Sequence, residues 1–348
     1  MHMSDALISA EVGVGCWLIS GAAIAMVSRK LQALPSTAAT PMLGVMGAFV
    51  FAAQMVNFAI PGTGSSGHLA GGVLLAVLLG SHAAFLAMAA VLVVQALFFA
   101  DGGLLALGAN IINMGVMPCL LVYPLVFRPL AGGARVTGWR WRLAVFCSAL
   151  LALQLGALGV VVESRLSDLA ELPWLAFLLA MLPIHLAIGV VEGFVSVAVL
   201  LFLYQLDPER REGAWYAPTR TTTRSRVLVA MGGVALVTGV LLPWYASSQP
   251  DGLEWSVARV IGRAEPDGSG GALHRVLSRL QKHTAPMPDY EFGRGDGQEG
   301  EAGSGLRAFR GEKSLAGLVG GALTLIVLWG VGWGLRRRSP VTPPASSP

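Results

Sequence analysis

Charged residues are scarce in this chain. Only 13% of its 348 residues are charged, whereas 54% are hydrophobic and the mean hydropathy is +0.65. Soluble domains contain about 25% charged residues, so the composition excludes an ordinary soluble enzyme or binding domain. We therefore expect an all-α polytopic membrane protein, because a helix satisfies its own backbone hydrogen bonds within lipid.

Cysteines are few, and the common catalytic motifs are absent. Cys16, Cys119 and Cys147 each fall in a different apolar segment and none belongs to a C-x-x-C pair, so we expect small buried residues and no zinc site. No H-E-x-x-H is present, which argues against an intramembrane metalloprotease. The stretch "GEKS" at 311–314 lacks the upstream glycine of a phosphate-binding loop. We therefore expect no enzymatic activity and no ATP site in this chain, with ATP hydrolysis on a separate partner chain.

Basic residues are grouped in short stretches between apolar segments. In a soluble chain, the net charge of +4 and the pI near 9.2 would hint at a nucleic-acid partner. Here the basic residues cluster around 29–30, 128–142, 210–226 and 336–338. Such clusters are typical of the cytoplasmic loops of membrane proteins. We expect contact with membrane lipid, no nucleic acid, and a cytoplasmic carboxyl terminus.

Nine apolar segments are candidates for crossing the membrane, since a spanning helix needs about 20 apolar residues. They are 7–27, 41–60, 66–80, 82–100, 103–127, 142–162, 174–204, 227–245 and 315–335. The third segment is short and rich in glycine, so we expect it to be broken or tilted. The connections "IPGTGSS", "ADGG" and "ESRLSDLAELP" contain only one basic residue, Arg165, and are expected outside together with the amino terminus.

The amino-terminal segment could also be a cleavable signal peptide, because "GAAIAM" loosely offers a cleavage site. However, Asp5 and Glu11 precede it, and no lysine or arginine does. This is the reverse of the basic leader of a signal peptide. We therefore expect the segment to be retained as a membrane helix.

A change in composition divides the chain into two modules. The polar stretch "DPERREGAWYAPTRTTTRSR" is typical of a linker between fused domains. We predict a seven-helix body at 1–205, a cytoplasmic linker at 206–226, a two-helix module at 227–338 and a cytoplasmic tail at 339–348. The module contains a long outer loop at 246–314, whose stretch "GRGDGQEGEAGSG" is too polar to bury much apolar surface.

Two histidines are predicted on the outer face. His2 follows the initiator methionine, and a Gly/Ser loop places His68 on the same side. Such a pair also arises by chance, and a terminal histidine is usually a surface residue. Position 2, however, has special chemistry, since the Met1 amine, the His2 backbone nitrogen and His2 Nδ1 can close adjacent chelate rings on one ion. His68 would complete a four-nitrogen set that suits Ni²⁺ or Cu²⁺ better than Ca²⁺ or Mg²⁺.

Polar side chains within the apolar segments are the next signal. Gln54 with Asn57, and Asn110 with Asn113, are each three residues apart and would share one helical face. They could hydrogen-bond between helices, or they could orient the metal-binding histidines. We include Asn57, Ser66, Asn110 and Asn113 as candidate supporting residues. His185 and Glu192 would share another face, where we favour an internal structural role over a transport relay.

Several motifs carry a family resemblance. The opening "MH", "NFAIPGTGSSGHLAGG" at 57–72, "LGANIINMG" at 107–115 and "HLAIGVVEG" at 185–193 agree in order and spacing with one family. Together they resemble the substrate-capture membrane subunit of cobalt/nickel transporters of the energy-coupling-factor class. The stretch "QPDGLEWSV" at 249–257 is similar to the PDGLE signature of the small accessory subunit of these transporters.

The resemblance implies a metal-ion uptake function and a set of partners. The implied metal ligands are the Met1 amine, His2 and His68, and the implied substrate is Ni²⁺ or Co²⁺. The implied partners are a transmembrane coupling subunit and two cytoplasmic ATPase subunits, in a bacterial cytoplasmic (inner) membrane. The accessory module would help to load the metal. A membrane metal sensor or scaffold without transport of its own remains the alternative.

Overall fold

The computed structural model describes residues 1–32, 40–132, 136, 138–169, 171–207, 221–266, 271–291 and 305–337. Within these residues, seven helices are long and apolar enough to cross a membrane, which confirms the polytopic helical fold. They are Ala10–Gln32, Ser81–Phe98, Leu107–Ala131, Trp139–Leu166, Trp174–Leu206, Ser225–Tyr245 and Gly311–Leu335. Most of the predicted linker and the whole predicted tail lie outside the described residues.

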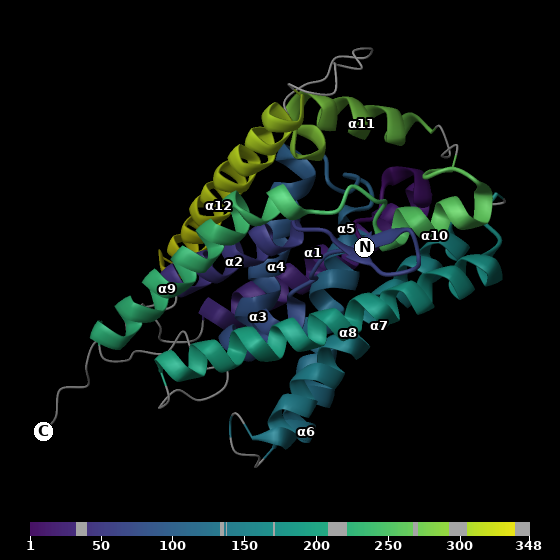
Figure 1. Cartoon of the computed structure of the whole chain (residues 1–348). Coiled ribbons are helices and arrows are strands. Elements are labelled where there is room, and N and C mark those ends of the chain that lie inside the picture. Colours follow the sequence, from purple (N-terminus) through teal and green to yellow (C-terminus); the bar gives the residue numbers. More distant parts are fainter. Residues whose placement is uncertain are drawn as a thin grey trace, which may run out of the picture.

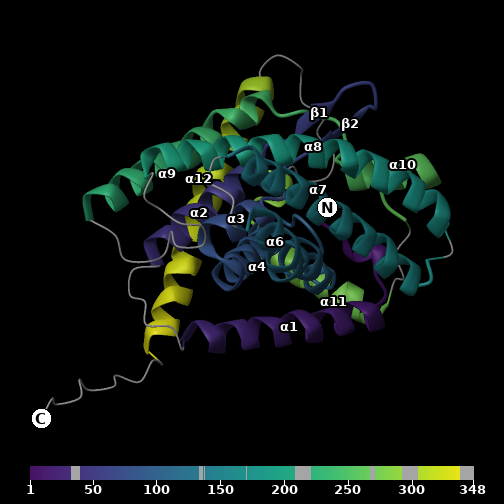
Figure 2. The same cartoon turned by 90° about the horizontal axis from the view of Figure 1, so that it is seen from below.

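Helices of the first module surround a buried centre. They are α1 (Ala10–Gln32), α2 (Thr40–Gln54), α3 (Gly72–Leu79), α4 (Ser81–Phe98), α5 (Leu107–Ile111), the π-helical segment Ile112–Phe127, α6 (Arg128–Ala131), α7 (Trp139–Leu166) and α8 (Trp174–Leu206). Helices α3 and α4 pack against each other and against the π-helical segment. Figure 2 shows α1 along the edge opposite α8 and α9, with α4 between them.

One of the nine predicted spans, 41–60, is wrong as a continuous helix, whereas the break expected in 66–80 is confirmed. Helix α2 ends at Gln54, and the chain then forms an antiparallel hairpin of β1 (Phe58–Ile60) and β2 (Ser65–Gly67). Helix α3 has only eight residues, all of them buried. Hydropathy alone cannot separate a short helix enclosed by protein from one facing lipid, and backbone that departs from a spanning helix is tolerated where protein surrounds it.

The accessory module, which we define as residues 221–337, lies against this body. It contains α9 (Thr221–Val240), a 3₁₀ turn at Leu242–Tyr245, α10 (Gly252–Ile261), α11 (Ala272–Thr284), a 3₁₀ turn at Pro288–Tyr290 and α12 (Gly305–Arg337). Helices α9 and α12 pack on α2 and on each other, and Figure 1 shows them along one flank of the molecule. Helices α10 and α11 lie across the end that carries the amino terminus.

Parts of the outer loop of this module bury apolar side chains. Leu253 and Val257 on α10 are buried, and α10 packs against α8. Met287 is buried near the end of the same loop. These buried residues lie outside the stretch "GRGDGQEGEAGSG", the part of the loop that was predicted to bury little apolar surface. The loop is polar on average, so average hydropathy does not reveal the apolar residues of α10. Their four-residue spacing places them on one helical face. Nearly all of "GRGDGQEGEAGSG" lies outside the described residues.

Candidate metal centre

The amino terminus is buried and fixed. The backbone N–H of Met3 donates to Asn110 Oδ1 at 2.8 Å, and Asn110 Nδ2 donates to the Met3 carbonyl at 3.2 Å. The N–H of Gly103 donates to the same carbonyl at 3.0 Å. Met1 and Met3 are 5% and 0% exposed. The first residues therefore lie at a defined position inside the protein, which a frayed chain end would not do.

The rings of His2 and His68 are stacked, with centroids 5.1 Å apart and planes inclined by 29°. His2 follows the buried Met1, while His68 follows β2 at the start of the connection to α3. Burial, with a smaller effect of the amino-terminal charge, lowers the pKa of both rings to about 3. Both imidazoles are therefore neutral near pH 7, the state in which histidine binds metals.

A chain of amides sets the tautomer of His2. Gln54 Nε2 donates to the Ala70 carbonyl at 2.8 Å, which leaves Gln54 Oε1 to accept from Gln95 Nε2 at 2.9 Å. Gln95 Oε1 then faces His2 Nε2 at 3.1 Å and can only accept. The proton of the neutral ring therefore sits on Nε2, and Nδ1 keeps its lone pair. Nδ1 is the atom that can close a chelate ring with the backbone and the Met1 amine.

His68 presents its other nitrogen. His68 Nδ1 lies 3.3 Å from the Leu69 carbonyl, to which it donates when it carries the proton. His68 Nε2 is buried and has no hydrogen-bond partner among the described residues. An unpartnered buried nitrogen is costly, so such an atom in a native fold calls for a ligand, an ion or an ordered water. His68 and Met1 line one small cavity, together with His185 and Asp251.

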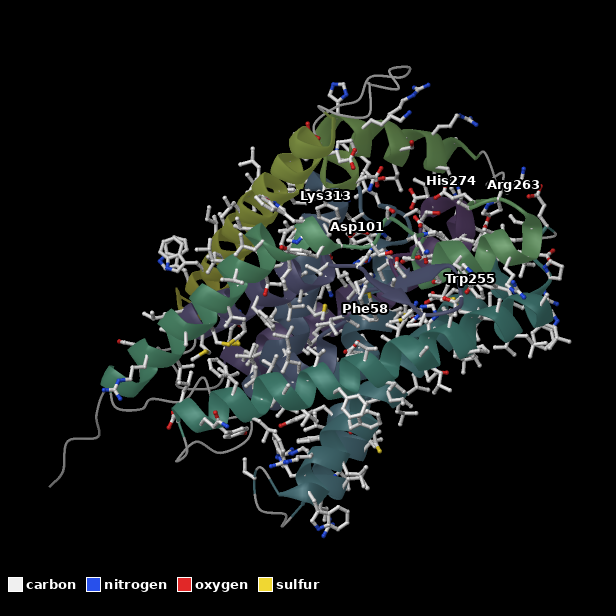
Figure 3. The ribbon with its side chains drawn as sticks, viewed as in Figure 1. Phe58, Asp101, Trp255, Arg263, His274 and Lys313 are labelled. Carbon is white, nitrogen blue, oxygen red and sulfur yellow. The ribbon has the colours of Figure 1, made fainter. Side chains whose placement is uncertain are left out.

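Two carboxylates complete the surroundings. Asp251 Oδ2 lies 3.4 Å from the Met1 amine and 4.0 Å from His68 Nε2. Burial acts to raise the pKa of Asp251, but the amino-terminal charge, the nearby histidines and the hydrogen bond from the Glu254 N–H together outweigh burial, and the pKa lies below its usual range. Asp101 Oδ1 lies 3.4 Å from His2 Nδ1, and Tyr290 donates a hydrogen bond to Asp101. Figure 3 shows Asp101 at the end of the body that the accessory module covers.

The structure thus brings Met1, His2 and His68 together and adds residues that sequence reasoning missed. Gln95 gave no motif or spacing signal. Asp251 belongs to the pattern Asp-x-x-Glu that predicts a helix start, and it does cap α10, but nothing in the sequence places it beside Met1. Within the described residues, no cluster of three His, Cys, Asp or Glu side chains has the form of a metal site.

The candidate supporting residues have different roles in the structure. Asn110 fixes Met3, as described above. Ser66 Oγ donates to the Gln249 carbonyl at 2.7 Å, and Asn57 lines a pocket with both histidines. Asn113 Nδ2 donates to Glu163 on α7 at 2.7 Å. Asn57 follows the end of α2, so it does not share a helical face with Gln54.

His185 and Glu192 are both buried on α8 and bond to backbone groups. Glu192 accepts from the N–H groups of Ala70 and Gly71 at 2.9 and 3.0 Å. His185 Nδ1 lies 2.8 Å from the Met181 carbonyl. Glu192 therefore fixes the backbone just after His68, which supports a structural role for this residue.

Comparison with known proteins identifies both modules. A family model described as "Cobalt uptake substrate-specific transmembrane region" matches residues 2–210, and a PDGLE domain model matches 225–337. A protein from Archaeoglobus fulgidus, named for fused nickel transport, is 32% identical over 97% of this chain and 98% of its own length.

Two further relatives agree with this assignment. A fused nickel transport protein from Rhodobacter capsulatus is 31% identical over 83% of this chain and 88% of its own length. The crystal structure of a transition metal transporter superposes with a TM-score of 0.53 at 26% identity, over 60% of this chain and 95% of that one.

Proposed function

This chain belongs to the family of cobalt-uptake substrate-specific transmembrane regions, and we propose that it is the substrate-binding component of a cobalt or nickel uptake transporter. The second half of the chain contains a fused PDGLE domain. The transport role follows from the family and from the fused nickel transport relatives. The ion is the transported substrate.

We further propose that the ion binds to the Met1 amine, to the backbone nitrogen and Nδ1 of His2, and to Nε2 of His68. The observation that carries this proposal is the unpartnered, buried Nε2 of His68 beside the stacked ring of His2. The amide chain from Gln54 supports it, because it keeps the lone pair of His2 on Nδ1. A set of four nitrogens suits Ni²⁺ and Co²⁺ and disfavours Mg²⁺ and Ca²⁺, which prefer oxygen.

The transport cycle requires partners. The chain has no phosphate-binding loop, so we propose that a transmembrane coupling subunit and two cytoplasmic ATPase subunits drive release of the ion. The basic clusters support an orientation with the amino terminus outside a bacterial cytoplasmic membrane and the carboxyl terminus inside. The ion would then be captured outside and delivered inward.

An amino-terminal extension tests the binding site. One residue added before Met1 removes the amine from chelating distance, and we expect tight Ni²⁺ and Co²⁺ binding to be lost in calorimetric titration of the purified chain. The matched control carries the same extra residue at the carboxyl terminus and should bind normally. Unchanged affinity in the extended protein would rule out the proposed ligands.

Metal accumulation in cells tests the transport function against the alternative of a membrane sensor or scaffold. Cells expressing this chain with coupling and ATPase subunits should accumulate Ni²⁺ or Co²⁺ above cells that carry an empty vector. The opposite outcome is a chain that binds the metal and leaves the cellular metal content unchanged, both with and without those subunits. That result would favour the sensor or scaffold.

A further inference from the structure

The turn that begins α10 sits directly on the metal-binding body. The N–H of Ser66 donates to the Pro250 carbonyl at 2.8 Å, next to the bond from Ser66 Oγ to Gln249. Gly252 follows in close contact with α8. A Cβ atom there would lie 2.8 Å from Ile188 Cδ1 and 3.1 Å from His185 Cε1, so a larger residue would require these side chains to move. The accessory module therefore meets the body within contact distance of the candidate metal centre.

The two oxygens of Asp251 have separate tasks at this contact. Oδ1 accepts from the N–H groups of Leu253 and Glu254, both at 2.8 Å, and so caps the start of α10. Oδ2 takes no part in the cap and faces the Met1 amine at 3.4 Å and His68 Nε2 at 4.0 Å. The cap fixes the carboxylate by its first oxygen, which leaves the second directed into the centre.

The Met1 amine depends on this second oxygen. The Met1 side chain is 3% exposed, and Asp251 is the partner that the described residues offer to the amine. A buried ammonium group without an opposite charge is strongly unfavourable. Asp101 does not replace Asp251, because it lies against the His2 ring and accepts from Tyr290.

From these contacts we propose that Asp251 is a positioning residue: the accessory module uses its carboxylate to hold the Met1 amine in place for the incoming ion. The inference rests on the proposed function, since it concerns one of the proposed ligands. It assigns to the PDGLE domain a direct contribution to the site: the body provides the nitrogens, and the module provides the charge that keeps the amine in place. Binding of the ion releases the extra proton of the Met1 ammonium group and the amide proton of His2 to solvent, and the same carboxylate then faces the bound metal and offsets part of its charge.

Two substitutions separate this role from the helix cap. Asp251→Asn keeps an oxygen that can cap α10, since asparagine caps as well as aspartate, but it removes the negative charge facing Met1. Glu254→Gln is the matched control. It removes a charge from the same turn and keeps the reciprocal bond to the Asp251 N–H, since glutamine serves in a capping box as glutamate does. Asp251→Ser retains a cap without a second oxygen and serves if the asparagine variant does not fold.

Two readouts on the purified full chain test the proposal. In calorimetric titration, Asp251→Asn should weaken Ni²⁺ and Co²⁺ binding by about ten- to a hundred-fold, the range for loss of a group that orients a metal ligand. In the metal-free protein, an amine-selective acylating reagent should modify Met1 several-fold faster in this variant, measured by peptide mass spectrometry. A helix cap alone would not change the reactivity of Met1. Glu254→Gln should leave both within about twofold of the parent chain.

The outcomes separate the two proposals. If Asp251→Asn behaves as Glu254→Gln does in both assays, the role of Asp251 is overturned while the proposed ligands stand. If binding weakens without faster acylation, Asp251 contacts the ion and does not position the amine, which also overturns the inference. If the amino-terminal extension leaves binding unchanged, the proposed site itself fails, whatever the aspartate variants show.

Discussion

The two modules differ in whether they enclose a helix. Within its most apolar window, the central helix α4 of the body is 72% buried, whereas the peripheral body helix α1 is 22% buried and the windows near α9 and α12 of the accessory module are each 28% buried. The body encloses buried polar side chains such as Gln54 and Gln95. The module has two mostly exposed helices and reaches the centre through the start of α10. The body therefore builds the proposed site, and the module covers it.

The strongest test of this division is removal of a ligand that the body supplies. His68→Ala removes one of four proposed nitrogens and an imidazole from the stacked pair, and we expect at least about a hundredfold loss of Ni²⁺ or Co²⁺ affinity by calorimetry. His283→Ala, at an exposed position on α11, is the control and should bind as the parent does. Equal affinities in the two variants would place the ion elsewhere.

The amide chain of the body should matter next. Gln95→Leu removes the acceptor that holds the proton on His2 Nε2, so we expect about a ten- to hundred-fold loss of metal affinity. Gln95→Glu keeps an acceptor for His2 but loses the donor to Gln54, and it should lose less. The idea of tautomer control would not survive if the leucine variant bound more tightly than the glutamate variant.

A substitution that alters the packing of the turn before α10 but not its charge should have a smaller effect on metal affinity. Gly252→Ala introduces a Cβ that must displace Ile188 and His185, and we expect about 1–3 kcal/mol of lost stability, as for overpacking elsewhere. The melting temperature should fall, and metal affinity should fall only a few-fold. Gly271→Ala, where the nearest atom is His274 Nδ1 at 3.4 Å, is the control with room for a methyl group. Equal melting temperatures for the two variants would mean that Gly252 has more room beside Ile188 and His185 than the distances indicate.

The smallest effect is expected for the hydroxyl that joins hairpin and module. Ser66→Ala removes the bond to the Gln249 carbonyl and keeps the backbone bond to Pro250, so it should cost about 1 kcal/mol of stability. Ser278→Ala, exposed on α11, is the control for denaturation measurements. A loss of metal affinity as large as that of His68→Ala would mean that Ser66 acts on the ion itself.

Hydropathy predicted most of the helices because long apolar segments have few alternatives within lipid. It failed for 41–60, where the turn residues Pro61, Gly62 and Gly64 allow a hairpin. For 66–80 the glycine content did indicate a broken span, and α3 is a short helix enclosed by other helices. Hydropathy also missed α10, since the surrounding loop is polar on average. These errors share one cause: a local average does not report which neighbours cover a segment.

The candidate site divides in the same way. The chelating chemistry of Met1 and His2 is local, because adjacent atoms of one chain close the rings, and the sequence alone could predict it. His68 could be assigned to the same face from the topology. Gln95 and Asp251 could not be found, since they reach the centre from 93 and 250 positions along the chain.

The sequence by itself determined the membrane class and the two modules, and it suggested the residues that we propose as metal ligands, because these depend on composition and on covalent neighbours. Only the tertiary structure decided which nitrogen of His2 keeps its lone pair, that His68 Nε2 lacks a partner, and that Asp251 faces the amine. Hydrogen-bond partners and opposite charges act over a few ångströms in space. Such distances between remote residues exist only once the chain has folded.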